Sequence, residues 1–343
     1  MATNRSAFEL LLDKYEPVLK AAFLDAIADI RSQVTLKLLV ERLERGDVAG
    51  AIDVLQIERS AFGPLELAFA EAYNAGGMDL ANGLKLRDPQ GQRVLFRFGV
   101  RNPEAEAWLA QHSATLVTRI VEDQRQGIRT ALAEGLARGD NPRRTALDVV
   151  GRVSRVTGER DGGIIGLTAP QERFVASARQ ELSAGDYSAY LTRERRDHRF
   201  DRTIAAAIKS GKPLDRATVD RIVGRYGDRL LELRADVLAM DQTFTALSKS
   251  KADAVLQAVR AGKVDASFVT KRWRHSGKAN ARHDHRRLNG TEVGFFEDFV
   301  MGDGTRVAYP HAPGTPAKHT LGCGCDFEIR IDYTGQFLAR RAA

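Results

Sequence analysis

Cysteine and long apolar runs are scarce in this sequence, and each absence excludes a class of protein. Only two of the 343 residues are cysteine, Cys323 and Cys325. A disulfide framework is therefore excluded, and a bond between the two would close a small, strained loop. No apolar run reaches the ~18 residues that a membrane span needs, and the first residues lack the basic-then-apolar pattern of a secretory signal. We therefore expect a protein without a membrane segment that stays in the reducing compartment where it is made.

Proline and glycine are also infrequent, with 10 and 30 residues, while 43% of the chain is hydrophobic and 28% is charged. This composition excludes global disorder and a collagen-like chain. At about 150 residues per domain, the length suggests roughly two domains with a sizeable core.

Helix signals dominate the first two thirds of the chain. Ser6 and Glu9 form a capping-box pattern, and Pro17 predicts the start of a second helix. A longer helix is expected after Asn102, and the segment 168–171 predicts the N-cap of another. One exception is the segment 94–100, where Phe and Val alternate with Arg and Gly after a turn at 88–91, and which we interpret as a strand.

The pattern changes after Trp273. A short helix is expected to carry Arg282, His285 and Leu288 on one face and to end at Asn289-Gly290. Then follow a hairpin with its turn at Asp303-Gly304 and a final alternating strand over 325–333.

The predicted fold class is therefore mainly α, with a helical N-terminal and middle region and a small α+β C-terminal domain. The predicted ranges are a helical region at 1–160, a helical linker region at 161–214 and a flexible tail at 334–343.

Positive charge is concentrated in one segment. The chain carries 52 Lys and Arg against 45 Asp and Glu, a net charge of +7. The segment 271–287 has seven basic residues and one acidic residue, 7 − 1 = +6. Such a cluster can neutralise phosphates, and Trp273 would be a stacking platform for a single strand. The alternative is an ordinary basic surface with Trp273 in the core. The candidate nucleic-acid-binding residues are Lys271, Arg272, Arg274, Lys278, Arg286 and Arg287.

Histidine and cysteine suggest a metal site in the same region. Five of the seven histidines lie between 275 and 319, just before the two cysteines. Thiolate and imidazole are the ligands that tetrahedral zinc prefers, so the candidate ligands are His285, His319, Cys323 and Cys325. The alternative is structural: Cys325 as a buried strand residue, Cys323 packed nearby, and His285 hydrogen-bonded to a backbone carbonyl. We expect no cofactor other than, at most, zinc.

Common catalytic signatures are absent: the chain has no G-x-x-x-x-G-K-[ST], no helix-opening G-x-G-x-x-G, no H-E-x-x-H and no G-x-S-x-G. Asp284-His285 followed by Asn289 suggests a His-metal nuclease, but such a site needs its His on a hairpin, whereas this one is on a predicted helix. We therefore expect no catalytic residues. The alternatives are a metal-dependent nucleic-acid enzyme and a DNA-binding protein that uses the basic, His-rich segment.

Several of these features occur together in one known family. In order and spacing they resemble the phage head morphogenesis domain typified by the F protein of bacteriophage Mu. The family forms are R-T-E, R-x-x-H-x-x-L-D-G and N-C-R-C, and this sequence departs from them at Ala235, Asn289, Gly322 and Gly324. The resemblance implies that the family domain covers residues 215–333. The residues that carry the resemblance are Arg234, Asp236, Trp273, Arg282, His285, Leu288, Asn289, Gly290, Tyr309, Pro310, Cys323 and Cys325.

The resemblance implies a minor capsid protein of a tailed phage or prophage. It would be needed in few copies at the portal vertex during head assembly, and it would contact packaged DNA. Its implied partners are the portal and other head or scaffold proteins, not a membrane, and its implied location is the virion head, assembled in the host cytoplasm. The resemblance does not imply an enzyme.

Overall fold

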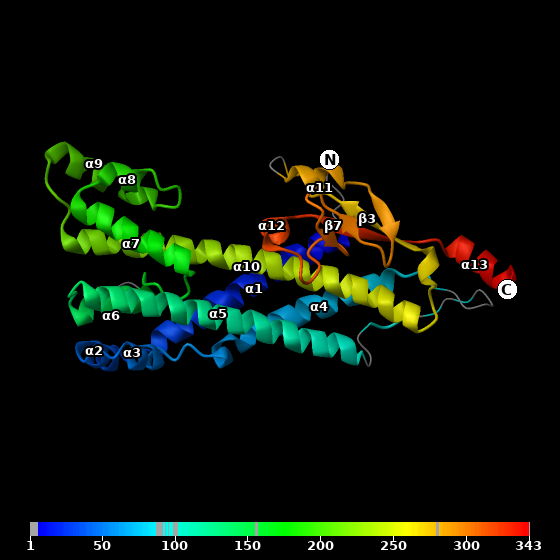
Figure 1. The fold of residues 1–343 in the computed structure, drawn as a ribbon, viewed down its shortest axis with the longest axis horizontal. Helices are drawn as coiled ribbons and strands as arrows, with labels where there is room; N and C mark the ends of the chain where they lie inside the picture. Colours follow the sequence, from blue (N-terminus) through cyan, green and yellow to red (C-terminus); the bar gives the residue numbers. More distant parts are fainter. Residues whose placement is uncertain are drawn as a thin grey trace. The chain divides into compact units, whose positions relative to one another are not determined.

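Helices make up most of this protein, as the computed structural model in Figure 1 shows. The structure describes residues 6–86, 92, 94, 96–98, 102–154, 157–278 and 281–342. Small sheets of two or three strands accompany the helices, and the three-stranded sheet lies in the C-terminal region. The predicted fold class, mainly α with a small α+β C-terminal part, is confirmed. No described helix combines the length and the apolar character that a membrane span requires.

Two compact units divide the chain, and each gathers segments that are distant in sequence. Unit 1 comprises Met1–Lys20, Leu67–Ser113 and Val237–Ala343, and unit 2 comprises Ala21–Glu66 and Ala114–Asp236. The predicted ranges were consecutive blocks and differ from these units. Composition along the chain cannot reveal that one long helix supplies residues to both units, as α10 (Arg216–Arg260) does.

Unit 2 is built from helices and one small hairpin. Buried apolar side chains such as Ile27, Leu132, Val149 and Ile222 form its core. Its elements, some of them shared with unit 1, are α1 (Ala7–Gln33), α2 (Leu36–Glu44), α3 (Val48–Val54), η1 (Arg59–Phe62), α4 (Gly63–Gly83), α5 (Pro103–Ala137), α6 (Pro142–Val150), β1 (Arg152–Val153), β2 (Arg160–Asp161), α7 (Ala169–Ala184), α8 (Tyr187–Leu191), η2 (His198–Phe200), α9 (Asp201–Ser210) and α10.

Unit 1 adds a small α+β module, which we call the C-terminal module (Val269–Ala342). Its sheet has the strand order β4-β3-β7, all antiparallel, and β5 pairs with β6 in a separate hairpin. The elements around and within the module are η3 (Ala266–Phe268), β3 (Val269–Arg274), α11 (His283–Arg287), β4 (Glu292–Gly294), β5 (Phe299–Val300), β6 (Arg306–Val307), α12 (Ala317–Thr320), β7 (Asp326–Ile331) and α13 (Tyr333–Ala342).

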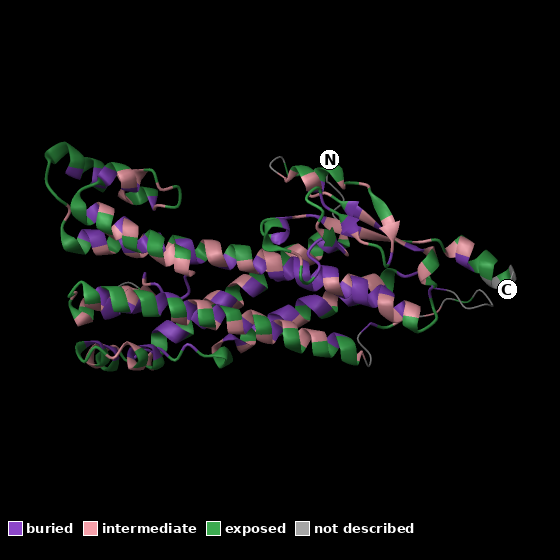
Figure 2. Cartoon of the chain, viewed as in Figure 1, coloured by how far each residue is buried: buried purple, intermediate pink, exposed green. Residues whose placement is uncertain are grey.

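The end of α10 anchors this sheet to unit 1. Val255 and Ala258 of α10 form a core cluster with Val269 of β3, and Ala252 packs in a second cluster with Phe327 of β7. Figure 2 shows this part of α10 as a largely buried stretch. The helix therefore holds β3 and β7 in place, and these strands lie next to the candidate site.

Local sequence signals in the C-terminal module predicted its elements well. The Asp303-Gly304 turn closes the β5–β6 hairpin, where the Met301 N–H donates to the Thr305 carbonyl at 2.8 Å. The alternating segment 325–333 contains β7, and the short helix α11 ends before Gly290, whose φ of +82° suits glycine.

Three local predictions were wrong. The predicted break at Pro17 is absent, because α1 continues through Pro17. Buried Tyr15 and Leu19 flank the proline, and their burial offsets the hydrogen bond that it cannot donate. The predicted strand at 94–100 lies partly outside the described residues, as does its turn at 88–91, and its described residues form no strand. Instead, buried Phe98 contacts the ring of Tyr73, with centroids 5.6 Å apart.

The third wrong prediction was the flexible tail at 334–343, since α13 covers nearly all of it. Gln336 is buried on this helix and holds it to the preceding loop. Its amide oxygen accepts from the Asp265 N–H at 3.0 Å, and its amide nitrogen donates to the Lys263 carbonyl at 3.3 Å. These two hydrogen bonds order a segment whose composition suggested a loose end.

Candidate metal centre

Two segments of the C-terminal module bring the three clustered ligands together. His285 lies on α11, and Cys323 and Cys325 lie in the turn that leads into β7. The end of α11 is fixed against β3, because the Gly290 N–H donates to the Trp273 carbonyl at 2.9 Å. The side-chain oxygen of Asn289 also accepts from the His275 N–H at 3.0 Å. The Asn-Gly pair therefore both ends the helix and positions it.

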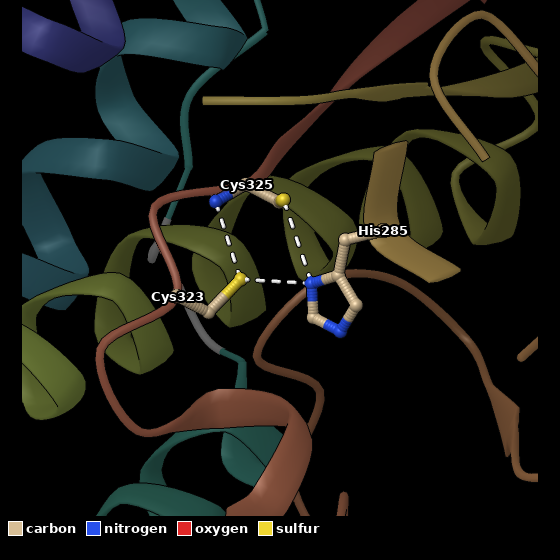
Figure 3. Close-up of side chains that lie close together, drawn as sticks. All are labelled: His285, Cys323 and Cys325. Carbon is tan, nitrogen blue, oxygen red and sulfur yellow. Dashed lines mark hydrogen bonds between the residues drawn. The ribbon is translucent and has the colours of Figure 1, made fainter. Parts of the chain in front are cut away.

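The donor atoms of His285, Cys323 and Cys325 lie within 4.8 Å of one another. As Figure 3 shows, Nδ1 of His285 points at both sulfur atoms, at 3.3 Å from Cys323 Sγ and 3.6 Å from Cys325 Sγ. In a tetrahedral zinc site, Zn–S and Zn–N bonds of about 2.3 and 2.0 Å place such nitrogen and sulfur atoms about 3.5 Å apart. The two observed nitrogen–sulfur distances are therefore close to those of a zinc site.

The cluster is buried and borders an apolar core. His285, Cys323 and Cys325 are 1%, 5% and 1% exposed, and Cys323 and Cys325 belong to a core cluster with Trp273 and Phe299. The Trp273 ring meets the His285 ring edge to face, with centroids 5.6 Å apart. A low-dielectric setting of this kind strengthens the attraction between thiolates and a cation.

The ionisation of the two thiols is coupled through their proximity. A hydrogen bond from Cys325, helped by His285 and His311, holds the pKa of Cys323 far below its ordinary value despite burial. The hydrogen bond to Cys323 and burial raise the pKa of Cys325, and the indole of Trp273 opposes that rise. The pair thus forms one thiolate readily, and a cation bound to both sulfurs would favour the second.

His319 does not join the other three predicted ligands. Its Nδ1 lies 3.4 Å from Nε2 of His285, on the edge of that ring opposite the sulfur atoms. Its own Nε2 contacts Oδ2 of Asp303 at 3.1 Å. Three of the four predicted ligands therefore lie together, whereas His319 lies outside that cluster, because sequence spacing does not tell which ring edge a neighbour approaches.

Two polar residues near the centre were missed by sequence reasoning. Asp303 was noted only as a turn residue, and His311 only as one of several histidines. His311 Nε2 lies 3.1 Å from the Cys323 carbonyl oxygen, and its Nδ1 lies 3.7 Å from Asp241. Burial lowers the pKa of His311, whereas Asp241 and Cys323 raise it, and the net pKa lies above the ordinary value. The partners are far apart in sequence, so the sequence alone did not predict that His311 contacts Cys323 or Asp241.

The predicted nucleic-acid-binding set needs one correction, at Lys271. This side chain is 2% exposed, and its Nζ donates to the carbonyls of Glu297 and Ala308 at 2.8 and 2.6 Å. Burial lowers its pKa to about 8. Lys271 cannot contact a phosphate, because the alternation of β3 places it on the same inward face as Val269 and Trp273.

Trp273 is 1% exposed, so the structure contradicts its use as a stacking platform. The other basic residues of the segment remain accessible. Arg274, Lys278, Arg286 and Arg287 are exposed, and Arg272 is half-buried. Within the described part of the chain, none of these five forms an ion pair.

The remaining residues that carry the family resemblance have structural contacts. Arg282 donates to the Leu321 carbonyl at 2.6 Å, Leu288 packs against the Trp273 cluster, and Pro310 is buried. Arg234 and Asp236 belong to unit 2, where Arg234 pairs with Asp123 at 3.2 Å. Neither residue belongs to the cluster of His285, Cys323 and Cys325.

Cavities lie in unit 2, among residues that the structure describes. Two of them have volumes of about 620 and 810 Å³ and are lined by arginines and aspartates, including Arg179 in the first and Asp220 in the second. No candidate site residue lines either cavity.

We compared the chain with known protein families, curated proteins and solved structures. The chain matches no protein-family model, no curated protein and no solved structure.

Proposed function

We propose that this chain is a minor capsid protein of a tailed phage or prophage, acting at the portal vertex during head assembly. The observation that carries the proposal is the convergence of the resembling motifs. Trp273, Leu288 and the Cys323–Cys325 turn are separated in sequence, yet they pack around one buried cluster in the C-terminal module. A set of motifs that specifies one small folded module is more informative than any single motif.

We also propose that His285, Cys323 and Cys325 hold a zinc ion. The support is the fit of the nitrogen–sulfur spacing, the free thiols and the apolar surroundings. Zinc bound there would tie α11 to the turn before β7, and its chemistry would be structural: it would neutralise two thiolates and cross-link the module.

The accessible cations of the module are the proposed DNA-contacting surface. Arg274, Lys278, Arg286 and Arg287 are exposed and lack ion pairs among the described residues, so their charge is free to meet phosphates or an acidic protein surface. The helical remainder would then supply surfaces for the portal and other head proteins.

Co-purification of the full-length chain with the cognate portal tests the assembly role. We expect a stable complex that survives gel filtration. Failure of the two purified proteins to associate, together with metal-dependent DNA cleavage that is lost in His285→Ala, would contradict the proposal and favour a nucleic-acid enzyme.

DNA binding at several salt concentrations tests the surface. The double variant Arg286→Glu and Arg287→Glu should weaken binding and reduce the salt slope by about 2, one unit for each lost phosphate contact. The matched control is Arg202→Glu and Arg216→Glu, two exposed arginines of unit 2 with the same change of charge. Equal effects of the two double variants would show that net charge alone matters, and would remove the proposed surface.

A further inference from the structure

Beyond the three proposed ligands, two more side chains line up behind His285. We infer that Asp303 and His319 form a hydrogen-bonded relay that fixes the ring of His285 with its Nδ1 lone pair directed at the metal position. The inference rests on the proposed zinc site and assigns its positioning residues.

The contacts run in one line from the hairpin to the sulfur atoms. Asp303 Oδ2 lies 3.1 Å from His319 Nε2, and His319 Nδ1 lies 3.4 Å from His285 Nε2. On the far side of its ring, His285 Nδ1 lies 3.3 Å from Cys323 Sγ. The two imidazole rings are stacked, with centroids 5.7 Å apart, and both residues are buried.

The first member of the relay is fixed as a hydrogen-bond acceptor. Asp303 sits in the β5–β6 turn, where Lys318 Nζ donates to it at 2.5 Å and the Thr305 N–H donates to it at 2.9 Å. These donors, Lys318 first, hold the pKa of Asp303 well below its ordinary value. An ionised carboxylate can only accept, so the contact with His319 requires a proton on His319 Nε2.

The positions of the other protons follow from that one. A neutral His319 protonated at Nε2 has an unprotonated Nδ1, which must accept from His285 Nε2–H. A neutral His285 protonated at Nε2 has its lone pair on Nδ1, and that atom faces the two sulfurs. The carboxylate thus selects, through two rings, the only neutral tautomer of His285 that can bind a metal at this place.

Relays of this kind raise the basicity of a ligating histidine and hold its orientation, and their loss weakens metal binding by about 10- to 100-fold. Here the relay also links the hairpin and α12 to the centre, since Asp303 and His319 belong to those elements. Neither residue was marked by the family motifs or by cysteine spacing.

Nitrogen-15 NMR of histidine side chains in the full-length, metal-free protein tests the relay directly. We expect both His285 and His319 in the Nε2–H tautomer. In Asp303→Asn, the amide group can donate to His319 Nε2, which favours the opposite tautomer of both rings. A wild-type spectrum with a proton on His285 Nδ1, or with His319 doubly protonated, would overturn the relay.

Competition for zinc with a chelator of known affinity gives the second readout. We expect Asp303→Asn and His319→Phe to bind zinc about 10- to 100-fold more weakly than the wild type. His319→Asn should recover part of the loss, because its amide oxygen can take the place of ring Nδ1. The control is Asp298→Asn. Asp298 lies next to the same hairpin, and its carboxylate pairs with Arg306 rather than with a histidine.

The two proposals fail in different ways. Wild-type protein that binds neither Zn²⁺ nor Co²⁺ would remove the zinc site, while the expected tautomers would still support the hydrogen-bonded relay. Normal metal binding in the wild type, with affinity unchanged in Asp303→Asn and His319→Phe, would overturn the relay alone.

Discussion

One arginine cluster of unit 2 and the basic segment 271–287 of the C-terminal module differ in how their arginines are paired. In unit 2, Asp148 and Asp220 are surrounded by Arg144, Arg152 and Arg179, and Arg152 contacts both carboxylates, at 2.9 and 3.0 Å. In the C-terminal module, Arg274, Arg286 and Arg287 are exposed and form no ion pair with any described residue. The three module arginines therefore have unpaired charge to offer a partner, whereas the arginines around Asp148 and Asp220 are paired with these carboxylates.

This difference explains why net charge identified the basic segment but did not reveal the many ion pairs in the rest of the chain. A nearly neutral sum over most of the chain is compatible with few charges or with many paired ones, and unit 2 has many paired ones. The pairing holds helices together there, whereas the module is held by an apolar cluster beside its three candidate metal ligands. The comparison predicts that removing metal will affect the module and that removing one carboxylate will affect unit 2.

Metal removal is expected to have the largest effect. Zinc at 1,000 times its dissociation constant would stabilise the folded state by about 4 kcal/mol. A chelator should therefore lower the thermal midpoint of unit 1, followed by tryptophan fluorescence, because Trp108 and Trp273, the only two tryptophans, both lie in that unit.

Cys325→Ser should abolish this response to the chelator. The control is His283→Asn, which changes an exposed histidine of the same helix α11 and should respond like the wild type. If a chelator leaves the wild-type thermal midpoint unchanged and elemental analysis finds no zinc, the C-terminal module is not stabilised by a metal.

The ion-paired half of the comparison is tested at Asp220, whose side chain is 13% exposed. Asp220→Asn leaves arginines without their counter-charge and should destabilise unit 2 by about 3 kcal/mol, measured by hydrogen exchange of its helices. Asp140→Asn removes an exposed pair with Arg138 and should cost no more than about 0.5 kcal/mol. Similar losses of stability in both variants would show that the buried ion pairs of Asp220 stabilise unit 2 no more than an exposed pair does.

Lys271 gives a pH-dependent test within the module. Its pKa is about 8 in the folded protein because burial disfavours the charged form, whereas an unfolded lysine titrates near 10.4. The unfolded state therefore binds more protons between these values, and stability should rise by about 2 kcal/mol from pH 8 to pH 10.

Urea unfolding followed by tryptophan fluorescence measures this rise, and the difference between wild type and Lys271→Met isolates it from other groups. The half-buried neighbour Arg272 provides the control, since Arg272→Met should keep the wild-type slope. If stability still rises with pH by the same amount in Lys271→Met, the rise belongs to another titrating group.

Local patterns allowed prediction of the elements of the module, and three-dimensional contacts decided the rest. The Asp303-Gly304 turn and the alternating strand were predictable because neighbouring residues determine them. The edge of the His285 ring that His319 approaches depends on how α12 packs against α11, which no spacing encodes. Lys271 was predictable in principle: it shares the alternation of Val269 and Trp273, but its charge was given more weight than its position.

The smallest expected effect, of opposite sign to that of Lys271, comes from Glu172 in unit 2. Burial, and then the nearby charge of Glu134, raise its pKa to about 7, with Arg173 opposing. Because the folded state binds the proton more tightly, stability should fall as pH rises from about 4.5 to 7, by less than about 1 kcal/mol for a half-buried side chain. Hydrogen exchange of α7 in wild type and Glu172→Gln measures this slope. If the stability of unit 2 instead rises over this pH range, with the same slope in both proteins, the carboxylates of its ion pairs must titrate there. The ion-paired network of unit 2 would then be weaker than we infer.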